Sequence, residues 1–223
     1  MAFRPTVRPM SYREFYRRHL PHWQPEGATL FVTTRLARTL PADVIKKLKA
    51  QRLAEKKVPS SASGKNSGQW YQKEKKAFAR WDAALAHSRS TVRWLIRPEI
   101  AHIVSEALHY RDGKVYQLIA FCIMPNHLHI IFTPLQSDEG YHPLEKIMQS
   151  LKRYTARQAS KILNRTGAFW QAENYDHVVR DSLELERIIQ YIVLNPVKAG
   201  LVKHWQDWPW TYCNPEYRTA LPE

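Results

Sequence analysis

The stretch VYQLIAFCIMPNHLHIIFT, residues 115–133, decides the fold because it holds two apolar runs on either side of Pro125-Asn126. Short apolar runs rich in β-branched and aromatic residues are typical of buried strands, and a Pro-Asn pair between them indicates a turn. We therefore predict a hairpin of two strands, 115–124 and 127–133. Side chains in a strand alternate between its faces, so His127 and His129 should share one face and Leu128 should point to the other.

The flanking segments extend this hairpin into a mixed sheet. A further strand is predicted at 29–36 and a short extended piece at 175–179, while apolar residues at helical spacing predict helices from Pro98 onward, at 142–164 and at 182–195. Asp181 is placed to cap the last helix with Glu184 three positions on, and this helix must end or kink before Pro196. The order β-α-β-β-α-β-α predicts an α+β fold of the ferredoxin-like kind, with the helices on one face of the sheet.

Residues 41–90 do not follow this core pattern and are interpreted as a helical insertion after the first strand. Residues 43–57 are typical of a basic helix, 59–68 of a flexible small-residue linker, and 70–87 of a second helix. The lysines of this helical hairpin are expected to form a solvated face. The chain as a whole, 1–223, is interpreted as a single domain that carries the insertion.

Composition narrows the range of partners. The chain has 34 Lys and Arg against 20 Asp and Glu, which gives a formal net charge of +14 and a pI near 9.9. Such a charge favours a polyanion as partner, and nucleic acid is the commonest one. No apolar run is long enough for a membrane span and no apolar signal opens the chain, so we expect a cytoplasmic protein. Two cysteines are too few for a disulfide framework or a cysteine zinc site.

Two groups of residues could carry chemistry. His127 and His129, on one strand face, form a possible pair of metal ligands, although two ordinary histidines are the alternative. Tyr191 and Asn195 lie one turn apart on the predicted helix 182–195. A tyrosine there could simply pack its ring and expose its hydroxyl. A nearby cation would instead make the hydroxyl able to attack a phosphate.

Basic and aromatic residues are consistent with a nucleic-acid partner. Arg153, Arg157, Lys161 and Arg165 are each four residues apart, which places them in one stripe on helix 142–164. The stripe could contact phosphates next to the candidate site or be a solvated face. The segment 204–210 holds three tryptophans that could stack on unpaired bases or pack in the core.

Several motifs occur together in a specific order: MPNHLH at 124–129, FWQ at 169–171, DHVVR at 176–180 and YIVLNPVKAG at 191–200. With RRHLPHWQ at 17–24 and WPW at 208–210, this combination resembles the single-tyrosine HUH transposases, in particular their REP-associated tyrosine transposase branch. The resemblance covers about 15–37 and 98–212. It implies that Tyr191 is the nucleophile and that His127 and His129 bind the metal. Asn195 would be the third ligand, where relatives often have Gln.

The resemblance implies a metal-dependent single-stranded DNA endonuclease and strand transferase that acts through a 5′-phosphotyrosine, on ends flanked by hairpins, with Mg²⁺ or Mn²⁺ as cofactor. DNA contacts are expected from Lys152, Arg153, Arg157, Lys161 and Arg180, in a monomer or homodimer that works at the bacterial nucleoid. One alternative is a domesticated, non-catalytic binder of single-stranded nucleic acid, although the aromatic strand signature of RNA-recognition domains is missing. Another is a metal-dependent hydrolase that uses water and does not need Tyr191.

Overall fold

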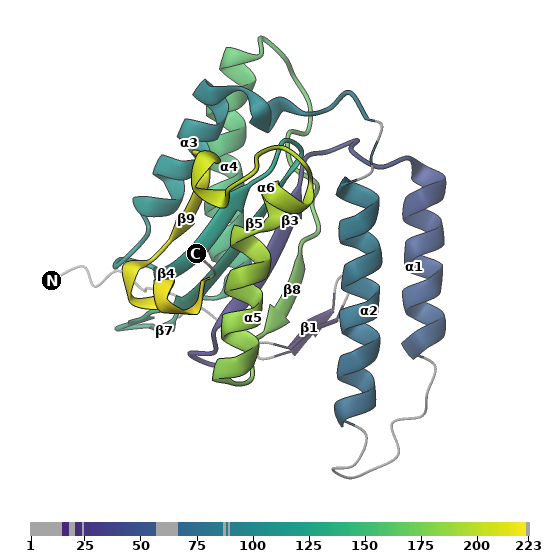
Figure 1. Ribbon diagram of the computed structural model, residues 1–223, viewed down its shortest axis with the longest axis vertical. Helices are drawn as coiled ribbons and strands as arrows, with labels where there is room; N and C mark the ends of the chain where they lie inside the picture. The colour runs from purple at the N-terminus through teal and green to yellow at the C-terminus, as the bar shows by residue number, and fades with distance from the viewer. Residues whose placement is uncertain are drawn as a thin grey trace, which may run out of the picture.

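A five-stranded antiparallel sheet forms the centre of the protein, in the order β8-β3-β5-β4-β9 (Figure 1). The computed structural model describes residues 15–17, 21–23, 25–56, 67–86, 88 and 90–221. The strands are β3 (Leu30–Arg35), β4 (Tyr116–Ile123), β5 (His127–Pro134), β8 (Tyr175–Val178) and β9 (Thr211–Cys213).

The predicted hairpin is confirmed as β4 and β5. The backbone N–H of Met124 donates to the carbonyl of His127 at 2.8 Å, which closes the turn over Pro125 and Asn126. In the register of the sheet, His129 lies between Cys122 of β4 and Thr33 of β3. The histidine strand is thus the central strand of the sheet, and its position is held by neighbours on both sides.

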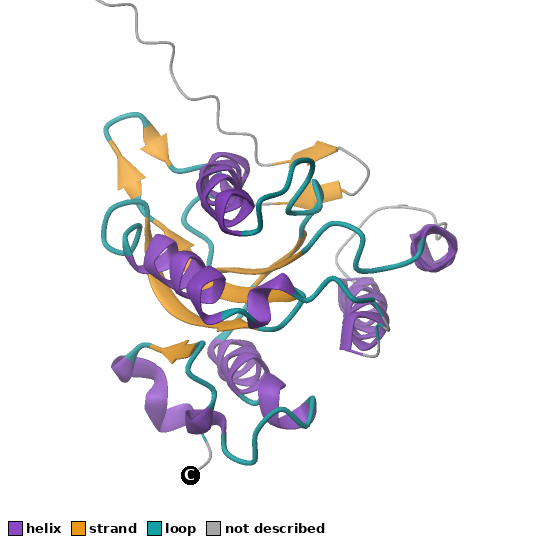
Figure 2. Cartoon of the chain, turned by 90° about the horizontal axis from the view of Figure 1, so that it is seen from above, coloured by secondary structure: helices purple, strands orange, loops and turns teal. Residues whose placement is uncertain are grey.

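Helices cover both faces of the sheet (Figure 2), so the expectation that they all lie on one face is wrong. Helices α3 (Pro98–His109) and α4 (Leu144–Ile162) pack on the face that carries Leu128 and Ile130. Helix α5 (Ser182–Val193) packs on the opposite face, against Ile131. Almost all consecutive residues of β4 and β5 are buried, so both faces of these strands are covered. A sheet that is apolar on both sides needs helices or loops on both sides to shield it from water.

Helix α5 begins where its sequence predicts but ends at Val193, two residues before the predicted end at 195. The Asp181 side chain accepts a hydrogen bond from the backbone N–H of Glu184 at 2.8 Å, a stabilising N-cap. The Glu184 carboxylate accepts from the backbone N–H of Arg180 at 2.9 Å and lies 3.0 Å from Nε2 of His177. The helix ends at Val193, and a short helix α6 (Asn195–Lys198) follows with Pro196 in its first turn.

The insertion contains two helices, α1 (Ala42–Lys56) and α2 (Ser67–Ala86), which stand side by side at one edge of the domain (Figure 1). They share a small apolar cluster that includes Leu40, Leu48 and Leu85 and is separate from the two cores on the faces of the sheet. Of the predicted flexible linker, 59–66 lies outside the described residues, and 67–68 already belong to α2.

The remaining elements are short. They are the strand pairs β1 (Phe15–Arg17) with β2 (Pro21–Trp23) and β6 (Gln136–Ser137) with β7 (Gly140–Tyr141), and the 3₁₀ turns η1 (Trp94–Ile96), η2 (Trp205–Asp207) and η3 (Pro215–Ala220). The tryptophans near the C-terminus pack against the cores, and the indole N–H of Trp208 donates to the carbonyl of Ile123 at 3.0 Å. No helix in the described part of the chain has both the length and the apolar composition of a membrane span.

Candidate active site

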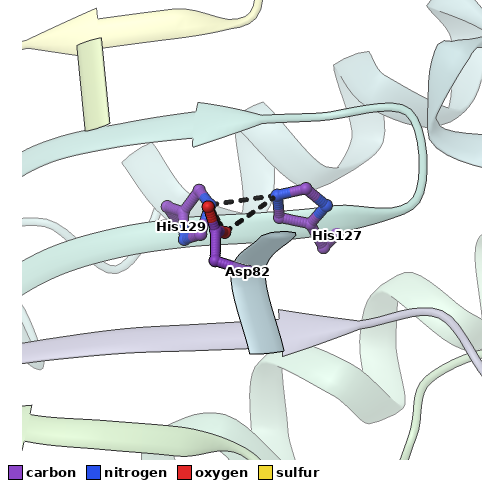
Figure 3. A group of neighbouring side chains, drawn as sticks. All are labelled: Asp82, His127 and His129. Atoms are coloured by element: carbon purple, nitrogen blue, oxygen red, sulfur yellow. Dashed lines mark hydrogen bonds and ion pairs between the residues drawn. The ribbon is translucent and has the colours of Figure 1, made fainter. Parts of the chain in front are cut away.

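The two histidines of β5 point to the same face of the sheet, where their Nε2 atoms lie 3.0 Å apart (Figure 3). Both side chains are buried, with exposed fractions of 2% for His127 and 0% for His129. This is the face covered by α5, because the intervening Leu128 belongs to the core on the α3 and α4 side. The strand alternation inferred from the sequence is therefore confirmed.

Each imidazole is oriented by a partner on its other nitrogen. The Nδ1 of His127 lies 2.5 Å from Oδ1 of Asn126, and the Nδ1 of His129 lies 2.8 Å from Oγ1 of Thr33. An amide oxygen can only accept, so His127 donates through Nδ1 and keeps a lone pair on Nε2. Such partners fix the tautomer and direction of metal-binding histidines. Asn126 also donates through its Nδ2 to the carbonyl of Leu85 in α2, at 3.0 Å.

Asp82 is a member of the site that the sequence analysis missed. It comes from α2, and its Oδ1 lies 3.3 Å from Nε2 of His129 and 4.0 Å from Nε2 of His127. A signal was present, because Phe78, Trp81, Asp82 and Leu85 follow the i, i+3, i+4, i+7 spacing of one helix face. A carboxylate in an otherwise apolar stripe indicates a partner in the interior.

Tyr191 and Asn195 approach the histidines from the α5 side. The rings of Tyr191 and His129 have centroids 5.4 Å apart, and the amide Nδ2 of Asn195 lies 3.3 Å from Nε2 of His129. The hydroxyl of Tyr191 is buried and makes no well-formed hydrogen bond within the described part of the chain. The structure thus brings together all four residues predicted for the metal site and the nucleophile, and adds Asp82.

The environment shifts the protonation of this cluster. Burial, and then the neighbouring His129, lower the pKa of His127 to about 3, against the opposing effect of Asp82. Burial alone would raise the pKa of Asp82, but the neighbouring His129, followed by the charge of His127, brings it to about 2. Burial, and then the Asp82 charge, raise the pKa of Tyr191. At neutral pH the site therefore holds a neutral His127, a carboxylate and a protonated phenol.

The donor set fits a divalent cation. One ligand atom from each of Asp82, His127 and His129 lies within 4.8 Å of the other two. Neighbouring ligands of an octahedral ion with bonds near 2.1 Å are about 3.0 Å apart, which is the separation of the two Nε2 atoms. The buried Oδ1 of Asp82 has no well-formed hydrogen bond within the described residues, as expected for an oxygen that a cation would satisfy. Two imidazoles and a carboxylate suit Mn²⁺ better than Mg²⁺.

A cleft of about 550 Å³ opens beside Tyr191, between α2, β8 and the α5–α6 segment. Its lining includes two basic residues, Arg187 and Lys198. The Lys198 ammonium lies 5.2 Å from the centre of the Tyr191 ring. The sequence places both residues near the predicted site, because Arg187 precedes Tyr191 by one helical turn and Lys198 follows Asn195 by three residues.

The structure separates the basic stripe from the histidines. Arg153, Arg157 and Lys161 are exposed on α4, which packs on the opposite face of the sheet from the candidate site. Lys152 donates to the carbonyls of Gln171 and Ala172 at 2.7 and 3.2 Å. The stripe and the histidines therefore lie on different sides of the sheet, because α4 and α5 cover different faces. Whether its residues contact DNA stays a prediction.

Two other tyrosines, Tyr154 and Tyr175, are placed differently from Tyr191. Tyr154 is 48% exposed and belongs to α4, which packs on the face of the sheet opposite to the two histidines. Tyr175 belongs to β8, and its ring packs against Phe78 with centroids 4.6 Å apart. Arg180, expected to contact DNA, is exposed just before α5.

Comparison with known proteins shows which family part of the chain resembles. Residues 87–195 match the family described as "Transposase IS200 like", and this match includes both histidines, Tyr191 and Asn195. The chain is therefore similar to the IS200-like transposases over 109 of its 223 residues, as its motifs predicted.

Within that class the relatives carry a more specific name. Two curated proteins named REP-associated tyrosine transposase are similar to this chain: one from Haemophilus influenzae, 30% identical over 43% of this chain and 58% of its own length, and one from Escherichia coli K12, 27% identical over 45% and 56%. The chain thus spans a little over half the length of the curated relatives. A solved structure of a REP-associated tyrosine transposase bound to a REP hairpin is 20% identical, with a TM-score of 0.45 over 91% of this chain and 82% of that chain.

Proposed function

We propose that this protein is a metal-dependent single-stranded DNA endonuclease and strand transferase with Tyr191 as its nucleophile. The observation that supports this most is the convergence of Tyr191 and Asn195 on two buried imidazoles whose Nε2 atoms lie 3.0 Å apart. A tyrosine is a poor nucleophile at neutral pH and needs a nearby cation to attack a phosphate. The position of Tyr191 next to side chains that could bind a cation therefore supports a role as nucleophile.

Each residue has a stated role in the proposed reaction. His127 and His129 would hold the cation, with Asp82 and Asn195 as the candidate oxygen donors, and a cation bound there polarises a phosphate as a Lewis acid. The oxygen of Tyr191 forms a bond to phosphorus while the bond from phosphorus to the 3′-oxygen breaks. The phenol loses its proton, the departing 3′-oxygen gains one, and a 5′-phosphotyrosine link remains. Attack by another 3′-hydroxyl reverses these steps, so no ATP is needed.

The proposed substrate is single-stranded or hairpin-bearing DNA. The net charge of +14 favours a polyanion. The cleft beside Tyr191 carries the basic side chains of Arg187 and Lys198 where a strand would enter. The two curated relatives are named tyrosine transposases, which supports DNA as the substrate. Action on chromosomal DNA would place the protein in the cytoplasm.

Covalent capture tests the proposal. The protein is incubated with labelled single-stranded DNA that carries the end of its own element, with Mn²⁺ or Mg²⁺, and the mixture is resolved under denaturing conditions. We expect a cleaved strand and a protein–DNA adduct that maps to Tyr191 by peptide mass. Tyr191→Phe keeps the ring contacts with His129 and Phe78 and should abolish both products.

Two outcomes would contradict the mechanism. Cleavage that persists in Tyr191→Phe without an adduct at any tyrosine would support a hydrolase that uses water. Tight DNA binding by the wild type without cleavage of the correct end would support a non-catalytic binder.

A further inference from the structure

The reacting groups of the candidate site are closed off from solvent. The two histidines are 2% and 0% exposed, and the hydroxyl of Tyr191 is buried. A phosphate attacked by Tyr191 must lie between that hydroxyl and the histidine nitrogens. The cleft beside Tyr191 is lined by Phe78 and Asp82 but by neither His127 nor His129. A phosphate that enters this cleft therefore reaches the histidine nitrogens only if one of the surrounding elements moves.

Helix α2 of the insertion covers the site. The ring of Phe78 packs edge-on against Tyr191 and His129, with centroids 5.6 and 6.3 Å away. One turn later, the carboxylate of Asp82 faces the Nε2 atoms of both histidines (Figure 3). The same helix turn therefore covers the nucleophile with an aromatic ring and the candidate ligands with an anionic oxygen.

Helix α2 is also the element that can leave at the lowest cost. The sheet holds β5 between two strands, and α5 is anchored by the fully buried Ile189, Ile192 and Val193. The α1–α2 hairpin instead has its own apolar cluster, which it keeps if it swings away as a unit. Elements with few contacts to the main core open with smaller free energies than the core itself.

We propose, on the basis of the proposed function, that α2 is an inhibitory cap and that Asp82 occupies the ligand position which a phosphate oxygen of the DNA requires. A carboxylate oxygen and a phosphate oxygen are both hard anionic donors, so they compete for the same cation and the same space. The carboxylate completes the cation site while DNA is absent. An incoming strand displaces Asp82, and the cap opens.

The affinities for Mn²⁺ and for single-stranded DNA, both measured without cleavage, test whether α2 is a cap. Binding of Mn²⁺ to the DNA-free protein is followed by the electron paramagnetic resonance of the free ion, for the wild type and for Asp82→Asn. Asp43→Asn, at the exposed start of α1, is the charge-matched control. We expect Asp82→Asn to weaken Mn²⁺ binding by about tenfold, the order of effect seen when metal-site groups are removed, and the control to bind normally.

The affinity for DNA should rise in the same variant whose affinity for Mn²⁺ falls. A ligand that binds only the open state has its affinity reduced by the closed fraction, so a loosened cap should tighten DNA binding. At saturating Mn²⁺, we expect both Asp82→Asn and Phe78→Ala to bind single-stranded DNA severalfold more tightly than the wild type. Phe78→Ala leaves the carboxylate in place and therefore keeps the test valid if Asp82→Asn folds poorly.

Two results would overturn the cap: unchanged Mn²⁺ affinity in Asp82→Asn, or DNA binding that is unchanged or weaker in both Asp82→Asn and Phe78→Ala. If the wild type forms no adduct, the proposed function fails, but the Mn²⁺ and DNA affinities still decide whether α2 is a cap.

Discussion

Asn126 connects the histidine strand to the insertion, and its replacement by alanine offers a sharp test of the site. Its Oδ1 accepts a hydrogen bond from Nδ1 of His127 at 2.5 Å, and its Nδ2 donates to the carbonyl of Leu85 at 3.0 Å. The side chain is 8% exposed, so water cannot readily replace either bond. Asn126→Ala therefore removes the group that orients His127 and leaves a donor and an acceptor without a partner.

The expected effects follow from these two bonds. Loss of a partner that orients a metal-binding histidine lowers metal affinity by about 10- to 100-fold, or about 1.4 to 2.7 kcal/mol of binding free energy. Two buried groups left without hydrogen bonds should lower the free energy of unfolding by about 2 to 4 kcal/mol. Mn²⁺ binding by calorimetry and unfolding by urea measure the two quantities separately.

Asn126→Asp is the matched variant. Its carboxylate can still accept from Nδ1 of His127 but cannot donate to the carbonyl of Leu85. We expect it to recover most of the Mn²⁺ affinity and little of the stability. Wild-type Mn²⁺ affinity in Asn126→Ala would refute the view that this residue fixes the direction of His127.

Three further predictions concern other parts of the chain. Replacing both Arg153 and Arg157 by Ala should weaken DNA binding across sequences and make it less dependent on salt, as measured by titration at several salt concentrations. An unchanged salt dependence would show that the exposed face of α4 is not part of the DNA interface. Lys152→Met should lower the free energy of unfolding by about 1 to 2 kcal/mol, because the ammonium holds two carbonyls, and an unchanged urea midpoint would contradict this. The pKa of His127 is lowered to about 3 in the folded protein, so the unfolded state binds a proton at a higher pH than the folded state does. The contribution of neutral His127 to stability is therefore fully present above about pH 6.5. It is lost by about 1.4 kcal/mol per pH unit as the pH falls toward 3. His127→Gln should show a shallower acid loss in metal-free urea titrations, and an identical pH profile would show that this histidine is not buried in its neutral form.

Much of the active-site pattern could be predicted because it depends on local backbone geometry. The alternation of side chains along a strand places His127 and His129 on one face whatever surrounds the strand. The helical period places Tyr191 and Asn195 one turn apart, and Pro196 ends the helix because it has no N–H to donate. These features require only the neighbouring residues in the chain.

Which faces meet could be decided only by the tertiary structure. Helix α5 lies on the opposite face from α3 and α4 because both sides of β4 and β5 are apolar, and this arrangement separates the basic face of α4 from the histidines. Asp82 reaches the site from a distant part of the chain through the packing of a whole helix. The helical period indicates that Asp82 faces the interior with Phe78 and Leu85. Which residues it meets there results from many weak interactions summed over α2 and its neighbours. The sequence by itself therefore determined the histidine pair and the tyrosine, whereas the packing of the insertion determined that a carboxylate and an aromatic ring cover them.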